Sequence, residues 1–125
     1  MNERLHARKY LLETIVASVD DAGEAAAGGA DRLELCSALV VGGLTPTLGT
    51  LRSIKQAIDL PVMCMVRPRE GGMDYSAAEF ATMLVDAELA LESGADGLVF
   101  GFLDSGGAIE TSRNWIYSGV GISSK

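Results

Sequence analysis

Short apolar stretches alternate along the chain with stretches of helical periodicity. The apolar and β-branched stretches predict four strands, over residues 9–17, 31–37, 60–68 and 96–103. The stretches between them predict three helices, over residues 18–28, 45–59 and 76–93, each introduced by a capping signal. Ser18 stands three residues before Asp21, Thr45-Pro46 supplies an N-cap and a first-turn proline, and Ser76 pairs with Glu79 in a capping box.

One phrase occurs twice. "GGADRLELC" (28–36) and "SGADGLVFG" (93–101) each close a helix and open a strand, 65 residues apart. Small residues at such a joint let the helix end approach the sheet closely, and helix-to-strand turns favour them in any case. The spacing of two strand–helix units supports a regular repeat.

The element order β-α-β-α-β-α-β with short connections predicts parallel strands joined by right-handed crossovers. The first strand-to-helix loop, "ASVDD", contains neither GxGxxG nor a P-loop, which disfavours a nucleotide-binding doubly wound sheet. The remaining α/β architecture is the (β/α)8 barrel of TIM type. Four strands cannot close it, so we expect an incomplete barrel of about four βα units.

The end of the chain departs from this pattern. Residues 1–113 form the expected half barrel, whereas "NWIYSGVGISSK" (114–125) shows neither a helical stripe nor strand alternation. We therefore expect an irregular tail. The open sheet edge then requires either the rest of a larger protein or another copy of the chain, which favours a homo-oligomer.

Charge and cysteine content narrow the function classes. The net charge of −7 disfavours nucleic acid and anionic membranes as partners, and no apolar run is long enough to span a bilayer. The two cysteines form no disulfide framework, and the first residues do not resemble a signal peptide. We expect a cytoplasmic protein, or one that also reaches the nucleus.

Strand alternation predicts which side chains face the barrel axis. Leu33, Leu35 and Cys64 should pack on the helices, and Arg32 and Arg69 should lie at the strand rims. The opposite set converges on the mouth, where parallel strands end: Glu13, Glu34, Cys36, Met65 and Arg67. Arg67 is the expected partner of the carboxylates, either in a structural ion pair or in ligand binding.

Two mouth loops are candidate contacts for a small anionic molecule. "GGLTPT" places a helix start there, with Thr45 and Thr47 beside free backbone N–H groups, although many such starts bind nothing. "REGGMDYS" brings Asp74 and Tyr75, and ordinary turn chemistry explains its glycines equally well.

A metal site needs closer inspection. The one histidine, His6, lies in a charged segment and is expected to be exposed. Met63, Cys64 and Met65 form a run of soft donors, but alternation sends Cys64 to the opposite face from the methionines. Core packing explains the run better, and Cys36 is the only thiol expected on the axis side.

Three long segments resemble the CutC copper-homeostasis family: "GGADRLELCSALVVGGLTPTLGTL", "LPVMCMVRPREGGMDYS" and "GADGLVFGFLDSGGAIE". The resemblance implies a cytosolic, often oligomeric TIM barrel linked to copper, with mouth positions at Glu13, Glu34, Cys36 and Arg67. Family members often carry a cysteine and an acidic residue where this chain has Ile15 and Ala17. Copper would then rely on Cys36, with Met65 as a weak partner. The family continues for another half barrel, so the chain reads as a truncated isoform with a divergent tail.

Three functions follow. The first is copper homeostasis, with copper binding weakened in this chain. The second is a TIM-barrel enzyme acting on a small anionic metabolite, with Glu13 or Glu34 as acid/base and Arg67 holding the substrate. The third is an inactive or oligomerising fragment.

Overall fold

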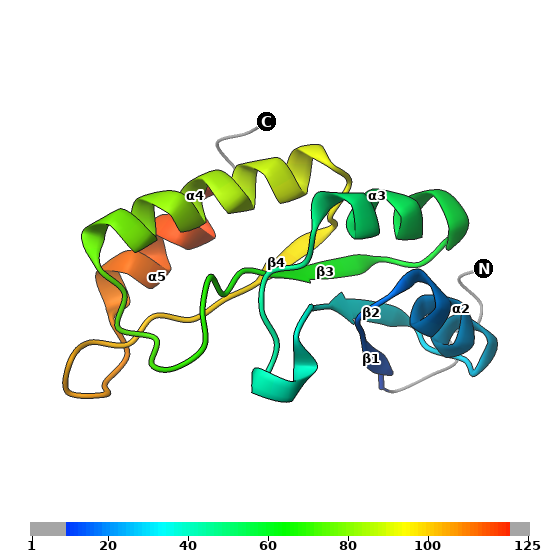
Figure 1. Cartoon of the computed structure of the whole chain (residues 1–125), viewed down its shortest axis with the longest axis horizontal. Coiled ribbons are helices and arrows are strands. Elements are labelled where there is room, and N and C mark those ends of the chain that lie inside the picture. Colours follow the sequence, from blue (N-terminus) through cyan, green and yellow to red (C-terminus); the bar gives the residue numbers. More distant parts are fainter. Residues whose placement is uncertain (1–9, 121–125) are drawn as a thin grey trace.

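The protein is described by a computed structural model over residues 10–120, and it is built on a four-stranded parallel sheet (Figure 1). The strands are β1 (Glu13–Val16), β2 (Arg32–Leu35), β3 (Val62–Met65) and β4 (Gly97–Val99), in the order β1-β2-β3-β4. The incomplete α/β barrel predicted from the sequence is confirmed. Each strand covers only an inner part of the apolar stretch that predicted it.

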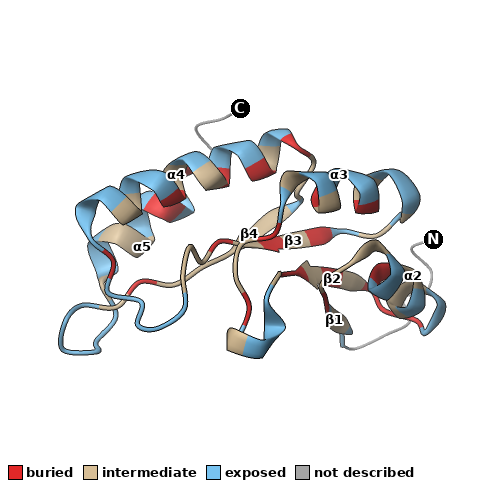
Figure 2. Cartoon of the chain, in the orientation of Figure 1, coloured by how far each residue is buried: buried red, intermediate tan, exposed pale blue. Residues whose placement is uncertain are grey.

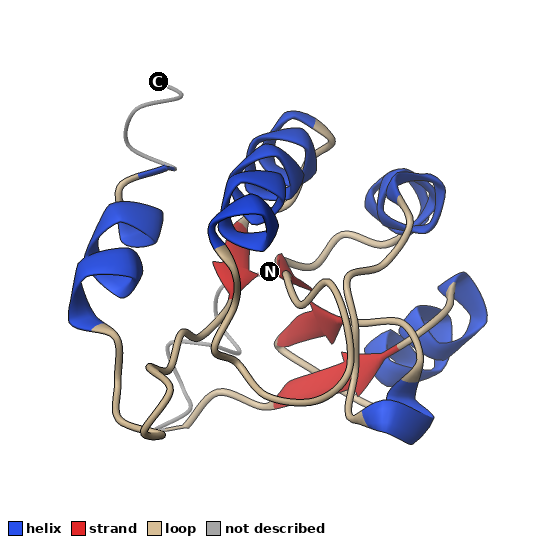
Figure 3. Ribbon diagram, turned by 60° about the vertical axis from the view of Figure 1, so that its left-hand side comes forward, coloured by secondary structure: helices blue, strands red, loops and turns tan. Residues whose placement is uncertain are grey.

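Helices follow each of the first three strands and lie on one side of the sheet (Figure 3). They are α2 (Val19–Ala27), α3 (Leu48–Ala57) and α4 (Ala77–Glu92), with α5 (Thr111–Ser118) after β4 and a short 3-10 turn, η1 (Leu39–Val41), after β2. The capping box of Ser76 and Glu79 is present at the start of α4. Among residues 10–120, no helix is both long and apolar enough to cross a bilayer.

The start of α3 differs from the prediction. Thr47, not Thr45, is its N-cap, and the Thr47 hydroxyl accepts a hydrogen bond from the Thr50 N–H at 3.2 Å. Thr45 is unavailable for capping because its hydroxyl accepts from the Arg67 N–H at 2.9 Å. Proline 46 therefore precedes the helix instead of forming its first turn.

The repeated phrase has a structural explanation in its aspartate. Asp31 Oδ2 accepts a hydrogen bond from the Leu12 N–H at 2.8 Å, and the Asp31 N–H donates to the Leu12 carbonyl at 2.8 Å. Asp96 makes the same pair of bonds to Val62, at 2.8 and 2.9 Å. Each aspartate thus fastens the start of its own strand to the start of the preceding one.

The strand residues on the helix-facing side of the sheet are buried (Figure 2). They are at most 1% exposed and pack against Ala22 of α2, Leu51 and Ile54 of α3 and Ala90 of α4. These strand residues are Val16, Leu33, Leu35, Val62 and Cys64. The prediction that Leu33, Leu35 and Cys64 pack on the helices is confirmed.

The predicted irregular tail is wrong for residues 114–118, which belong to α5. Tyr117 is 1% exposed, and its hydroxyl donates to the Met83 carbonyl at 2.7 Å. The centroid of its ring lies 4.5 Å from the ring centroid of Phe100. An aromatic cluster contributed by α4, the segment after β4 and α5 therefore stabilises this helix. Tyr117 is the one buried residue of α5, and a single buried residue produces no helical periodicity that the sequence could show. Residues 121–125 of the expected tail lie outside the described residues.

Candidate functional site

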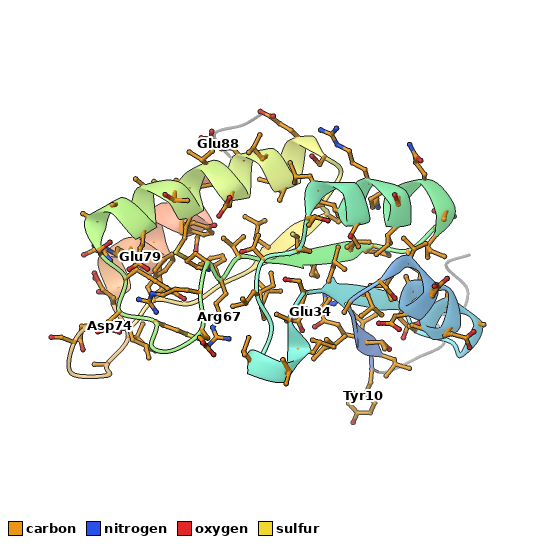
Figure 4. All side chains as sticks on the ribbon, viewed as in Figure 1. Tyr10, Glu34, Arg67, Asp74, Glu79 and Glu88 are labelled. Atoms are coloured by element: carbon orange, nitrogen blue, oxygen red, sulfur yellow. The ribbon has the colours of Figure 1, made fainter. Side chains whose placement is uncertain are left out.

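The predicted site residues gather on the sheet face opposite the helices, which we call the inner face. Glu13 and Ile15 of β1, Glu34 of β2 and Met65 of β3 alternate with residues buried on the helix-facing side. Cys36 and Arg67 continue this alternation just beyond β2 and β3. Figure 4 shows Glu34 and Arg67 on the side of the sheet away from α3 and α4.

Two carboxylates lie side by side on the inner face. Partial burial, the charge of Glu13 and a hydrogen bond with Glu13 raise the pKa of Glu34 above its ordinary value. Glu13 also pairs with Arg32, whose Nε donates to Glu13 Oε2. Glu34 therefore keeps its proton up to a higher pH than an exposed glutamate does.

The expectation that Arg67 pairs with these carboxylates is wrong. Arg32 lies at the strand rim as predicted: it is the first residue of β2, its side chain is 40% exposed, and it pairs there with Glu13, the first residue of β1. Arg32 meets Glu13 because these two residues stand opposite each other in the β1–β2 register. The Arg67 guanidinium instead donates to main-chain carbonyls, those of Val41, Gly43 and Gly71. Sequence alternation gave the correct face for Arg67 but not its partners.

Two sulfur atoms lie close to Gly43. A Cβ built on this buried glycine would lie 3.1 Å from Met65 Sδ and 3.4 Å from Cys36 Sγ. The absent side chain leaves a small cradle bordered by one thiol and one thioether, both of which are soft donors suited to copper(I). Cys36 and Met65 thus fit the metal that the sequence resemblance implies.

Burial, and secondarily the charge of Glu34, raise the pKa of the Cys36 thiol to about 11. The thiol is protonated at neutral pH, so a metal ion must displace a proton to bind it. In contrast to Cys36, Cys64 lies in the helix-facing core, where its pKa is raised to about 12, first by burial. Within residues 10–120, no group of three or more His, Cys, Asp or Glu side chains is placed to hold a metal ion. His6 lies outside the described residues.

The residues of the two predicted mouth loops differ in what they contact. Thr45 is bound to Arg67, whereas Thr47 caps α3, so the two hydroxyls do not act together; anion binding at this helix start stays a prediction. Asp74 lines an open hollow of about 490 Å³ near Asp104, Glu110 and Arg113. Tyr75 also borders it, but its ring is 6% exposed and packs edge-on against Phe102.

Sequence reasoning missed Gly43 as part of the site. The sequence analysis assigns to "GGLTPT" only a helix start with free backbone N–H groups, whereas both glycines have positive φ, +94° and +95°. Two consecutive glycines in the loop that follows Cys36 are the signal that could have indicated a close approach of backbone to side chain.

Comparisons with known proteins agree with this architecture. The sequence profile of the CutC family matches residues 10–118. A "family protein CutC" of Treponema denticola is 52% identical over 102 residues, which are 82% of this chain and 42% of that protein. The human "Copper homeostasis protein cutC homolog" is 49% identical over 104 residues, 83% of this chain and 38% of that protein.

A solved structure supports the same assignment. The crystal structure of the putative copper homeostasis protein CutC from Streptococcus agalactiae matches with a TM-score of 0.81 at 30% identity, over 89% of this chain and 55% of that one. The chain spans about two fifths of the length of the curated relatives it matches. The chain belongs to the CutC family.

Proposed function

We propose that this chain takes part in copper homeostasis by binding copper(I) between Cys36 and Met65. Two curated relatives carry that role in their names, and the chain shares about half of its residues with each over the matched region. The observation that carries the proposal is that the Cys36 and Met65 sulfurs both lie beside the side-chain-free Gly43. Copper is the bound cargo in this proposal, and a thiolate and a thioether are suitable ligands for it.

The surroundings favour weak, proton-coupled binding. Because the pKa of Cys36 is about 11, each copper ion that binds the thiolate releases one proton near neutral pH. Glu34, which lies close enough to Cys36 to raise its pKa, is the nearest candidate to accept that proton. Ile15, at a position where the family resemblance implies additional ligands, adds no soft donor.

The test is an anaerobic titration with copper(I) in competition with a chromophoric chelator. Cys36→Ala should weaken binding by at least about 100-fold. It removes a direct ligand, whereas changing a residue that only contacts a ligand already costs about 10- to 100-fold. Cys64→Ala is the matched control, because it removes an equally buried thiol from the opposite face of the sheet. Unchanged binding in Cys36→Ala would refute the copper site.

A second function is supported by the carboxylate pair. Glu34, with its raised pKa beside Glu13, has the property expected of a general acid in an enzyme acting on a small anionic metabolite. A metabolite screen would test it. Loss of turnover in Glu34→Gln with copper binding intact would favour the enzyme, whereas absence of turnover with any metabolite would leave copper binding as the function.

A cytoplasmic location and a homo-oligomeric state remain proposals from the sequence. The unpaired edge of β1 and the exposed side chain of Ile15, 56% accessible, are features that another copy could cover. Light scattering coupled to size-exclusion chromatography measures the mass directly, and a monomeric mass would refute the oligomer.

A further inference from the structure

Arg67 occupies the centre of the inner-face loops without touching an acidic side chain. Its Nη1 donates to the carbonyl oxygens of Val41 at 2.9 Å and Gly43 at 3.0 Å. Its Nη2 donates to the carbonyl oxygen of Gly71 at 3.2 Å. One guanidinium therefore joins the loop after β2 to the loop after β3.

These contacts leave Arg67 poorly suited to bind an anion. A bidentate grip on a carboxylate or phosphate uses two adjacent N–H groups of the guanidinium. Both hydrogens of Nη1 are already directed at carbonyls, which removes the end-on pair. Nε is buried and has no hydrogen-bond partner among the described residues, so a solvent-borne anion cannot reach the side-on pair.

The loop that Arg67 grips covers the sulfur pair. Residues 37–45, which we call the cover loop, are closed at their base by Ser37 and Leu44, whose N–H and carbonyl groups exchange two bonds of 2.8 Å. Thr45 adds two bonds to the main chain of Arg67. Gly43, held by the guanidinium, sits against Cys36, which is only 2% exposed although it faces away from the helices.

We propose that Arg67 is a positioning residue that holds the cover loop closed over Cys36 and Met65. It acts through the three carbonyls and not by binding a substrate anion. The effect on the Cys36 thiol stands on the geometry alone, whereas the effect on copper rests on the proposed function. Loss of the guanidinium should open the cover loop while the helix-facing core stays packed.

The primary experiment measures alkylation of the two cysteines by mass spectrometry in Arg67→Lys and Arg67→Ala. Cys36 should be labelled at least about 10-fold faster than in the wild type, an increase that corresponds to about 1.4 kcal/mol of lost closure. Cys64 should keep its wild-type rate, because it lies on the other face of the sheet. Lysine retains the charge but not the planar fork, so both variants should behave alike.

Arg69→Ala is the matched control. Arg69 lies two residues away and also binds carbonyls, those of Glu70 and Gly72, but it pairs with Glu79 and does not touch the cover loop. It should leave Cys36 labelling unchanged. Wild-type labelling of Cys36 in Arg67→Lys would overturn the proposal, as would equal acceleration of Cys36 and Cys64, which indicates general unfolding.

Copper titration separates the two proposals. If Cys36→Ala abolishes binding in the intact chain, Arg67→Lys should weaken copper(I) binding about 10-fold while the thiolate-to-copper absorption band persists. If Cys36→Ala leaves binding unchanged, the copper site fails, and the alkylation rates still decide the role of Arg67. The positioning role would be contradicted if Cys36 is a copper ligand and the Arg67→Lys variant still binds copper as the wild type does.

Discussion

The two cysteines offer a comparison between the faces of one sheet. Cys36 and Cys64 are 2% and 1% exposed, and burial is the first cause of the raised pKa of each thiol. Cys64 is enclosed by aliphatic side chains and helices, whereas Cys36 is enclosed by a thioether, a glycine and a nearby carboxylate. Equal burial therefore does not mean equal chemistry, because the neighbours decide whether a buried thiol can exchange its proton for a metal.

The comparison predicts that packing energy is concentrated on the helix-facing side. Leu35→Ala removes a side chain that is 0% exposed, and it should lower the free energy of unfolding by about 2–5 kcal/mol. Ile15→Ala removes an aliphatic side chain from the inner face that is 56% exposed, and it should cost less than about 1 kcal/mol. Urea denaturation followed by circular dichroism measures both. Similar losses would mean that the inner face is packed too.

A smaller effect is expected at Gly43, where the inner face admits no side chain. Gly43→Ala places a Cβ between the sulfurs at a φ of +95°, so it should weaken copper(I) binding at least about 10-fold and cost about 1 kcal/mol of stability. Gly107→Ala is the control for backbone strain, because Gly107 has a φ of +85° and open space around its Cα. If both variants bind copper as the wild type does, the cradle at Gly43 is not the site.

The smallest effect concerns the pH dependence of Glu34. Its pKa in the folded chain is raised, so the protonated form contributes stability at acidic pH, and this contribution is lost as the pH rises through the folded pKa. The Glu34→Gln variant has no carboxyl group at this position, so it has no such contribution to lose. Between about pH 4 and pH 7 the melting temperature of this variant should therefore gain about 2 °C relative to the wild type.

Glu88→Gln removes the same charge from the exposed surface of α4 and controls for net charge (Figure 4). Thermal melts at both pH values measure the difference for each variant. An equal gain in the two variants would show that Glu34 and Glu13 do not interact specifically.

The sequence predicted most of what depends on local pattern. The alternation of Leu33, Glu34 and Leu35 identified the two faces of the sheet, and the Ser76–Glu79 box located the start of α4, because both signals lie within a few residues. The partners of Arg67 could not be predicted, since main-chain carbonyls of two loops carry no side-chain signature. The helix containing Tyr117 was missed because its stability comes from tertiary contacts with Phe100 and Met83.

The paired bonds of Asp31 and Asp96 bear on the mouth although both residues stand at the opposite ends of their strands. Each aspartate fixes one alignment between neighbouring strands, β1 with β2 and β3 with β4. A slip of one residue in either pair would break both bonds and turn every side chain of the slipped strand to the other face. A slip of β2, for example, would turn Glu34 toward the apolar core and Leu33 and Leu35 toward the inner face. Asp31 and Asp96 are remote from the sulfurs, yet they keep the strands in the register that places Cys36 and Met65 on the inner face.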